Sequence, residues 1–490
     1  MQNFAPLSSK CVLVLLCAAS VAPAAAAQVW LPSKLDTNGA TSFGGAFAIN
    51  ETGTAVGFAE FIGGPANAAA IWTSSGTALL PVLVGDDVAL ALDVNAAGTA
   101  VGTSTDLVNL GPITQIFDHP VVWSQGVATD VRTLVTGGAA LELLSAVGID
   151  DAGRIIGRAR TPGGVGRGFL LENGIVVDIG DLGGPFPGTE VHAIGEDGSI
   201  VGASTASTTF PHAIVWQNGV VSDLHDFAQM PGRVSHAYDV NNRGVVCGSG
   251  DFVADFLDYE EAVVFDHGTI VRLGTLAGNQ PWAQAFAFGI NDLSHVVGAT
   301  NLPTGEPRAF IWRGGGVMQD LNRFLPSGSG WVLTSAEDIN NDGRIVGQGI
   351  FNGVLHAFVL VPDGQGTFTP YGTACVGGGG LLPQLANVGL PAPGFPFALE
   401  VKDGAPFAFG AHLVGLGQGA LPLTPSCDLA IAPFSALYFP VTLDASGSAF
   451  TKFNLAKTVS GLDLTLQSAF LDLAAPDLVS ATNALRLVMP

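Results

Sequence analysis

The stretch "DINNDGRIVGQG" runs from Asp338 to Gly349 and contains the pattern that decides the fold. It places Asp338, Asn340 and Asp342 at alternating positions before a glycine, as at the start of an EF-hand calcium loop. The twelfth position of such a loop supplies a carboxylate, but here that position is Gly349. The same residues also fit a tight β-turn, so a calcium site and a turn without ligand are both open.

Recurrence of the pattern favours the turn. The seven copies are "AINETGTAVG" (Ala48–Gly57), "DVNAAGTAVG" (Asp93–Gly102), "GIDDAGRIIG" (Gly148–Gly157), "AIGEDGSIVG" (Ala193–Gly202), "DVNNRGVVCG" (Asp239–Gly248), "GINDLSHVVG" (Gly289–Gly298) and "DINNDGRIVG" (Asp338–Gly347). The closing glycines lie 45, 55, 45, 46, 50 and 49 residues apart. The leading Asp occurs only in copies two, five and seven, as Asp93, Asp239 and Asp338. We therefore expect a type I turn with a left-handed glycine, and no cofactor other than a possible calcium ion.

Each copy continues with the same further signatures. A run such as "AIVWQNG" follows in every copy, and six copies add a short run such as "VVDIGDLGG" (Val176–Gly184). Four strands in a period of this length are typical of a β-propeller blade. The seventh copy lacks its last strand, and "QVWLPSKLDTNGATSFGG" (Gln28–Gly45) fits the missing strand and its loop. The sequence thus predicts an all-β, seven-bladed propeller over residues 28–364, closed by its N-terminal strand.

The combined signatures resemble the HAF repeat of extracellular bacterial proteins. "HAIVWQNG" (His212–Gly219) and "HAFVLVPDG" (His356–Gly364) carry the resemblance best, and it extends over residues 28–364. The first copy lacks the histidine, and other residues stand near its place in three more copies. The resemblance implies export and a repeat architecture, and it implies no particular chemistry.

The first 27 residues predict a secretory signal peptide. Lys10 precedes the apolar run "CVLVLLCAASV", which is too short to span a bilayer, and "APAAAA" precedes a predicted cleavage after Ala27. The formal net charge of −23 argues against nucleic acid and anionic lipid as partners. We expect a secreted or cell-surface protein that is monomeric and has no transmembrane segment.

A different module follows the repeats. Residues 365–374 read as a Gly/Thr/Pro-rich linker, and residues 375–490 contain short apolar runs that predict a β-sandwich of about seven or eight strands. The module resembles C-terminal modules of other secreted bacterial repeat proteins. Cys375 and Cys427 are predicted to form a disulfide, because both belong to this module and export exposes them to oxidising conditions. Cys247 replaces Ala, Ile or Val of other copies and is predicted to be a buried filler.

Loops of variable length are the predicted binding region. The gap between the closing glycine and the aromatic position ranges from 13 to 21 residues, and such loops often carry function. Acidic residues lie beside aromatic ones, above all in "GDFVADFLDYEEA" (Gly250–Ala262). This pattern fits the binding of a sugar chain or a cation, and it also fits a solvated acidic loop. The candidate ligand-binding residues are Asp251, Phe252, Asp255, Phe256, Asp258, Tyr259, Glu260, Glu261, Phe117, Asp118, Phe186, Trp282 and Trp331.

Three functions remain open at this level. The leading prediction is a secreted, non-catalytic binding protein whose partner is a polysaccharide or another surface protein. The alternative is a carboxylate-dependent glycan hydrolase or lyase, with Asp255, Asp258 and Glu260 as its first candidates. A purely structural component of an envelope or matrix is the third. The chain contains no H-E-x-x-H, G-x-S-x-G or phosphate-binding glycine motif, which favours the first.

Overall fold

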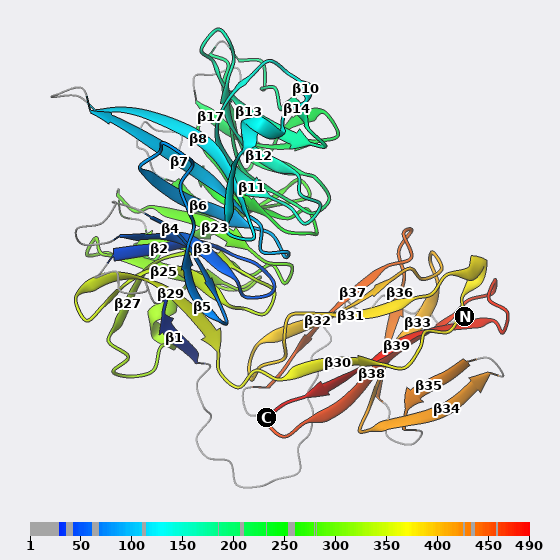
Figure 1. Cartoon of the computed structure of the whole chain (residues 1–490). Coiled ribbons are helices and arrows are strands. Elements are labelled where there is room, and N and C mark those ends of the chain that lie inside the picture. Colours follow the sequence, from blue (N-terminus) through cyan, green and yellow to red (C-terminus); the bar gives the residue numbers. More distant parts are fainter. Residues whose placement is uncertain are drawn as a thin grey trace. The chain divides into compact units, whose positions relative to one another are not determined.

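The computed structural model describes residues 29–35, 43–60, 68–109, 114–184, 186–205, 210–231, 233–252, 260–278, 280, 282–424, 427–432, 437–456 and 459–490. The protein is all-β: over these residues it consists of strands and three short 3-10 helices (Figure 1). It divides into two compact units, one formed by Trp30–Val361 and one that contains Pro362–Pro490.

The first unit contains small, separate sheets that follow the sequence repeat. Numbered by repeat, they are β2 (Phe43–Ile49), β3 (Ala55–Glu60), β4 (Ala68–Thr73) and β5 (Gly76–Leu79); β6 (Val88–Val94), β7 (Ala100–Asn109), β8 (Thr114–Ser124) and β9 (Val127–Asp130); β11 (Glu142–Ile149), β12 (Ile155–Arg160), β13 (Gly166–Glu172) and β14 (Ile175–Asp178), with β10 (Gly137–Gly138) beside β14; β15 (Thr189–Ile194), β16 (Ile200–Thr205), β17 (Pro211–Gln217) and β18 (Val220–Asp223); β19 (Ser235–Val240), β20 (Val246–Asp251), β21 (Glu260–Asp266) and β22 (Thr269–Gly274); β23 (Ala285–Ile290), β24 (Val296–Asn301), β25 (Pro307–Trp312) and β26 (Gln319–Asp320); and β27 (Trp331–Ile339), β28 (Ile345–Phe351) and β29 (Val354–Pro362) with β1 (Trp30–Lys34). Two helices, η1 (Val131–Leu134) and η2 (Leu321–Phe324), follow β9 and β26.

The repeated motif forms the turn that joins the first two strands of each repeat. The residue three places after the turn residue donates its N–H to the turn residue's carbonyl, as Gly343 does to Asn340 at 3.0 Å. Glycine at that place has φ of 70 to 82° in six repeats, and Ser294 has φ 56° in the sixth. The predicted type I turn with a left-handed residue is confirmed, and the glycine avoids the cost that a Cβ would bring there.

The N-terminal strand belongs to the last sheet. β1 lies beside β29, so this sheet has the order β1-β29-β28-β27, as the missing fourth strand of repeat seven predicts (Figure 1). Trp30 anchors β1: its ring is 1% exposed, packs edge-on against Phe324 and donates its Nε1–H to Gly343 at 3.1 Å. Two segments more than 300 residues apart are thus joined by hydrogen bonds and by burial of a large aromatic ring.

The core of this unit lies between successive sheets. Val201 and Ala213 of repeat four pack against Ala237 and Val263 of repeat five, and equivalent clusters join most other neighbouring repeats. Repeat seven meets repeat one in the same way, with Val346 in the cluster of the first repeat. A single sheet of four strands cannot bury its two faces alone, so each repeat depends on its neighbours.

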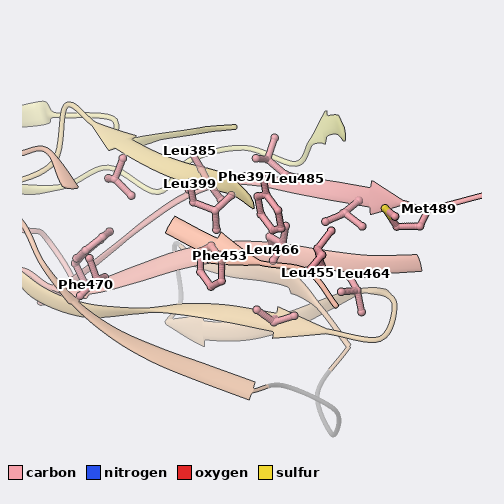
Figure 2. Packing of buried hydrophobic residues seen from close by; sticks show 14 of the residues in the cluster. Leu385, Phe397, Leu399, Phe453, Leu455, Leu464, Leu466, Phe470, Leu485 and Met489 are labelled. Carbon is pink, nitrogen blue, oxygen red and sulfur yellow. The ribbon is translucent and has the colours of Figure 1, made fainter. Parts of the chain in front are cut away.

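The second unit has a core between two sheets. One sheet has the order β30 (Thr367–Tyr371), β39 (Val479–Val488), β38 (Asp463–Leu471), β33 (Phe409–Gly415), β36 (Leu437–Thr442); the other is β31 (Gln384–Val388), β32 (Pro396–Lys402), β37 (Ala449–Asn454); and β34 (Gln418–Thr424) pairs with β35 (Cys427–Ile431). The helix η3 (Gly378–Gly380) precedes β31. Figure 2 shows side chains of both sheets in one apolar cluster, among them Phe397, Phe453, Leu466 and Leu485.

The cysteine predictions are confirmed. Cys375 and Cys427 form a disulfide in the second unit. Cys247 is fully buried in β20, where its thiol contacts the carbonyl oxygen of Ala287 at 3.3 Å. Burial raises the pKa of the Cys247 thiol, which keeps it protonated and unreactive.

Candidate functional site

The first strand of every repeat carries a β-bulge at the same place. In repeat one, Ala46 and Ala48 pair with the adjacent residues Gly57 and Val56, so one residue is left without a partner. The same shift occurs in the other six repeats. The extra residues, called the bulge residues below, are Phe47, Leu92, Val147, His192, Tyr238, Phe288 and Glu337.

The closing glycine of the repeat explains why the bulge recurs. A Cβ at any of these seven glycines would lie less than 3.0 Å from a backbone oxygen of the first strand. For Gly347 that oxygen belongs to Ser335, two residues before the bulge residue Glu337. Only glycine allows the two strands to approach so closely, and bulges of this kind redirect a side chain away from the regular alternation.

The bulge residues line one cavity. Its volume is about 290 Å³, and its wall is made by the same segment of all seven repeats, from the bulge residue to the turn. Each bulge residue is half-buried, as expected for a side chain that faces a partly open space. The residues on either side are Ala, Gly or Val except for Asp93, Asp239 and Asp338, whereas the bulge residues differ from repeat to repeat. A constant scaffold therefore presents a variable set of side chains to one space.

Aromatic rings form a continuous arc in this wall. The ring of His192 lies 5.4 Å from that of Tyr238, and Tyr238 lies 5.6 Å from Phe288, both edge to face. Phe47 contacts Phe58 on the side of repeat one, at 5.6 Å. The connected rings thus span repeats four, five and six, and Phe47 adds a separate ring from repeat one.

Carboxylates of repeats two, five and seven lie beside the bulge residues. Asp338 accepts the N–H of Ile339 and, at 2.8 Å, the N–H of Ile49 in repeat one. Asp93 and Asp239 make the equivalent bonds to Ile149 of repeat three and Ile290 of repeat six. The leading Asp of the motif is therefore a link between neighbouring repeats.

Burial makes these aspartates weak acids. It raises the pKa of Asp93 and of Asp338 to about 6, against the lowering effect of the backbone N–H bonds. Burial also raises the pKa of Asp239 well above its usual range, and the negative charges of Asp338 and Asp93 add to this. The mutual effect shows that the three carboxylates share one poorly solvated environment.

The turn residues add a second set of links. Each turn Asn holds its own turn with its side-chain oxygen and donates its amide to the turn of the next repeat, as Asn340 does to the carbonyl of Asn50 at 3.0 Å. The same amide bond joins repeats one to two, two to three, five to six and six to seven. The side-chain oxygens of Asp338 and Asn340 thus accept hydrogen bonds from backbone N–H groups, as is typical of a structural turn.

His192 differs from the other bulge residues. Its Nε2 atom is buried and has no hydrogen-bond partner. Burial, with the nearby positive charge of Arg158 and the charge of His236, lowers the pKa of His192 to about 4. The imidazole is therefore neutral near pH 7, and one ring nitrogen can accept a hydrogen bond.

The acids predicted from the sequence are engaged within repeat five. Asp251 and Glu260 face each other on β20 and β21. Glu260 accepts the hydroxyl of Ser249 and bonds to His236 at 3.3 Å. Glu261 is buried and forms an ion pair with Arg272. Asp255, Phe256, Asp258 and Tyr259, like the predicted signal peptide, lie outside the described residues.

The predicted aromatic residues are spread over several sheets. The guanidinium carbon of Arg272 lies over the ring of Phe252, 4.8 Å from the centre of that ring. Trp331 is buried against Phe351 and Phe358. The exposed candidates are Phe117 on β8, Phe186 before β15 and Trp282 before β23, and Asp118 accepts the hydroxyl of Thr105. Strand pairing and Arg272 place Asp251, Phe252, Glu260 and Glu261 near one another, and among the described residues these contacts join none of the four to the candidates of other repeats.

Sequence reasoning missed the bulge residues, although a signal for them exists. Each lies three places before the turn residue, so an alignment of the seven copies puts them in one column. That column contains Phe, Leu, Val, His, Tyr, Phe and Glu between small or aliphatic neighbours. Chemical variety within a conserved frame is the sign of a position that the fold leaves free.

The comparisons with known proteins identify no relative. No family model matches the chain, and no curated protein matches it. Two solved structures of the GH32 beta-fructofuranosidase BmSUC1 of Bombyx mori align with it. One, a mutant in complex with sucrose, is 9% identical, covers 67% of this chain and 90% of its own, and has a TM-score of 0.27. The other is 8% identical, covers 94% of each chain and has a TM-score of 0.25. Scores this low support no conclusion about fold or activity.

Two further structural observations concern metal ions and membranes. Within the described ranges, no group of three or more His, Cys, Asp or Glu side chains is placed to hold a metal ion. Over the same part of the chain, no helix is long and apolar enough to cross a membrane.

Proposed function

We propose that this is an exported, non-catalytic binding protein that takes one unit of an extracellular polysaccharide into the cavity lined by the bulge residues. The observation that carries the proposal is the variable set of seven bulge residues around one cavity on a constant scaffold. A volume of about 290 Å³ suits a small ligand or a single residue of a chain better than the surface of another protein.

The proposal includes a closed, seven-bladed β-propeller followed by a β-sandwich. Closure is supported by β1 beside β29 and by the bonds from Asp338 and Asn340 of repeat seven to repeat one. The sandwich is supported by the shared core of the two larger sheets in the second unit. In such a propeller the cavity lies on the axis, where the first strands of all blades converge.

Export and membership of the HAF-repeat proteins are part of the same proposal. The N-terminal sequence and the repeat signature support them, and the disulfide between Cys375 and Cys427 suits an oxidising compartment. A binding role is favoured over the hydrolase or lyase because Glu260 and Glu261, two acids of the predicted loop, already bind partners within their sheet. An acid–base pair needs carboxyl groups that can reach a substrate.

The test compares a cavity aromatic with a peripheral one. Tyr238→Ala removes a ring from the cavity, and Trp282→Ala is the matched control on an exposed loop. With the exported protein and a panel of extracellular oligosaccharides, calorimetry is expected to show about ten-fold weaker binding for Tyr238→Ala and less than about two-fold change for the control. Loss of binding in the Trp282 variant alone would move the site to the peripheral loops, and release of reducing ends would establish an enzyme.

A further inference from the structure

We propose that the cavity selects a ligand group that carries a positive charge, namely an aliphatic ammonium such as the free amino group of an amino sugar. This inference rests on the proposed function and specifies the chemistry of its ligand. Three independent features support it: the charge of the wall, the aromatic arc and the unpartnered nitrogen of His192.

The charge of the wall is one-sided. Eight acidic side chains line the cavity, and no Lys or Arg is among the described residues of its lining. Asp93, Asp239 and Asp338 are close enough for their charges to disfavour one another. A cation placed between them would remove this repulsion, and a low-dielectric wall strengthens the attraction. The overall net charge of −23 would also speed the approach of cationic ligands.

The oxygen atoms of these aspartates are available to a ligand donor. Each carboxylate oxygen can accept two hydrogen bonds, and the backbone N–H groups of Ile339 and Ile49 account for one on each oxygen of Asp338. An ammonium group carries several N–H donors and can use the remaining acceptor positions. A bare metal ion is disfavoured, because no cluster of ligating side chains at coordinating geometry exists among the described residues.

The aromatic arc suits the alkyl side of such a group. Tyr238 and Phe288 lie edge to face at 5.6 Å, and both line the cavity, as does Phe47. Aromatic faces attract ammonium groups and pack against the carbon atoms attached to them. A wall of acids and aromatic rings therefore favours an organic cation over a hydrated inorganic one.

His192 points to a specific hydrogen bond. Its buried Nε2 has no partner, and the residue lines the cavity. A buried nitrogen without a partner is costly, and a turn of the imidazole toward the cavity would let a ligand N–H satisfy it. Arg158 and His236 lie close enough to affect His192. Neither lines the cavity.

The test uses paired oligosaccharides. Calorimetry with the full-length exported protein compares a glucosamine tetrasaccharide, which has free amino groups, with its N-acetylated counterpart, and ethanolamine serves as a primary ammonium without sugar. We expect the glucosamine form to bind at least ten-fold more tightly than the acetylated form. Binding near pH 6 should release protons, because a cation beside Asp93 and Asp338 favours their ionised forms.

Two variants assign the effect to the cavity. Glu337→Gln removes one charge from a bulge residue without breaking a link between repeats, and Tyr238→Leu removes an aromatic face. Each is expected to weaken glucosamine binding, Tyr238→Leu by roughly 2- to 30-fold. Glu142→Gln, at an exposed acid outside the cavity, is the matched control and should have no effect.

The outcomes separate the two proposals. Equal binding of both oligosaccharides overturns the charge preference and leaves the polysaccharide function standing. Binding of ethanolamine without either sugar supports the cation site and overturns the polysaccharide. Binding of none of the three contradicts both proposals. Equal binding by Glu337→Gln, Tyr238→Leu and the wild type places any glucosamine site outside the cavity and overturns the inference.

Discussion

The junction between repeats seven and one differs from the junction between repeats four and five. At the first, Asp338 and Asn340 both cross to the neighbouring repeat, and the N–H of Asn341 donates to the carboxylate of Glu51 at 3.1 Å. At the second, the equivalent residues of repeat four are Ala193 and Gly195, which have no side-chain group that could make these bonds.

The apolar contacts do not share this difference. Val201, Ala237 and the fully buried Met230 pack at the junction of repeats four and five much as aliphatic residues do elsewhere. The turn link is present between repeats seven and one, whose joined segments are about 290 residues apart, and also between repeats one and two, two and three, five and six, and six and seven. Repeats four and five are joined instead by the N–H of Ala213, which donates to the hydroxyl of Ser235 at 2.9 Å. The difference therefore follows the residue at the turn position and not the length of chain between the repeats.

The largest expected effect on stability comes from forcing apart the first two strands of repeat seven, which Gly347 allows to lie close together. A valine at Gly347 would collide with the backbone of Ser335 and Ala336 and with Phe358, so Gly347→Val should lower the free energy of unfolding by about 4 kcal/mol or prevent folding. All seven tryptophans lie between Trp30 and Trp331, so denaturation followed by tryptophan fluorescence reports on this unit alone. Gly316→Ala, which has open space around its Cβ, is the control.

Ionisation of the linking aspartates should weaken their junctions next. The folded pKa of Asp93 and Asp338 is about 6, above the ordinary value of 3.8, so the folded state holds more protons than the unfolded state. The stability that they contribute is complete below about pH 4 and is lost as the pH rises through 6, a change of the order of 3 kcal/mol for each aspartate. Urea midpoints at pH 4.5 and 7 measure it. If the urea midpoint of the Asp93→Asn, Asp338→Asn double variant changes between pH 4.5 and 7 as much as that of the wild type, the assignment to these aspartates is wrong.

Removing one amide link should cost less. Asn340→Ala deletes the bond to Asn50 and the cap of its own turn, and we expect a loss of about 2 kcal/mol in the free energy of unfolding. Gln217→Ala, which removes an exposed amide bond within repeat four, should change it by less than about 0.5 kcal/mol. Equal losses in the two variants would mean that the link from Asn340 to Asn50 contributes no more than an exposed hydrogen bond within one repeat.

Adding the missing link should have the smallest effect. Gly195→Asn supplies an amide at the turn of repeat four, where the side chains of Ser199 and Asp197 would have to move slightly. We expect a gain of about 0.5 kcal/mol in denaturation experiments, because a new hydrogen bond is partly offset by this adjustment. A loss of stability would show that Gly195 is needed for its own packing.

The repeat made much of the fold predictable. The spacing of the motif predicts the turn, the four strands of each repeat and the place of β1, and the structure confirms these pairings. The bulge could not be predicted in the same way, because one extra residue in a strand leaves the period of the repeat unchanged. In the sequence the closing glycine only marks the end of each motif. Its role, which is to allow the first two strands to approach closely, depends on a backbone contact between them.

The predicted loop site was harder to judge from sequence. Glu261 resembles a free surface acid in the run of acids, but its partner Arg272 lies on the next strand. Trp331 resembles an exposed loop aromatic, yet Phe351 and Phe358 cover it. Pairings across strands decide which acids and rings remain available, and a local pattern does not contain them.

The unpaired position of the bulge has a consequence for protein engineering. A residue that has no cross-strand partner can be exchanged with little penalty to strand pairing, and seven such positions surround one space. A combinatorial library restricted to these seven codons would alter recognition while leaving every glycine and turn intact. Gene duplication followed by drift at the same codons would have explored that repertoire in nature.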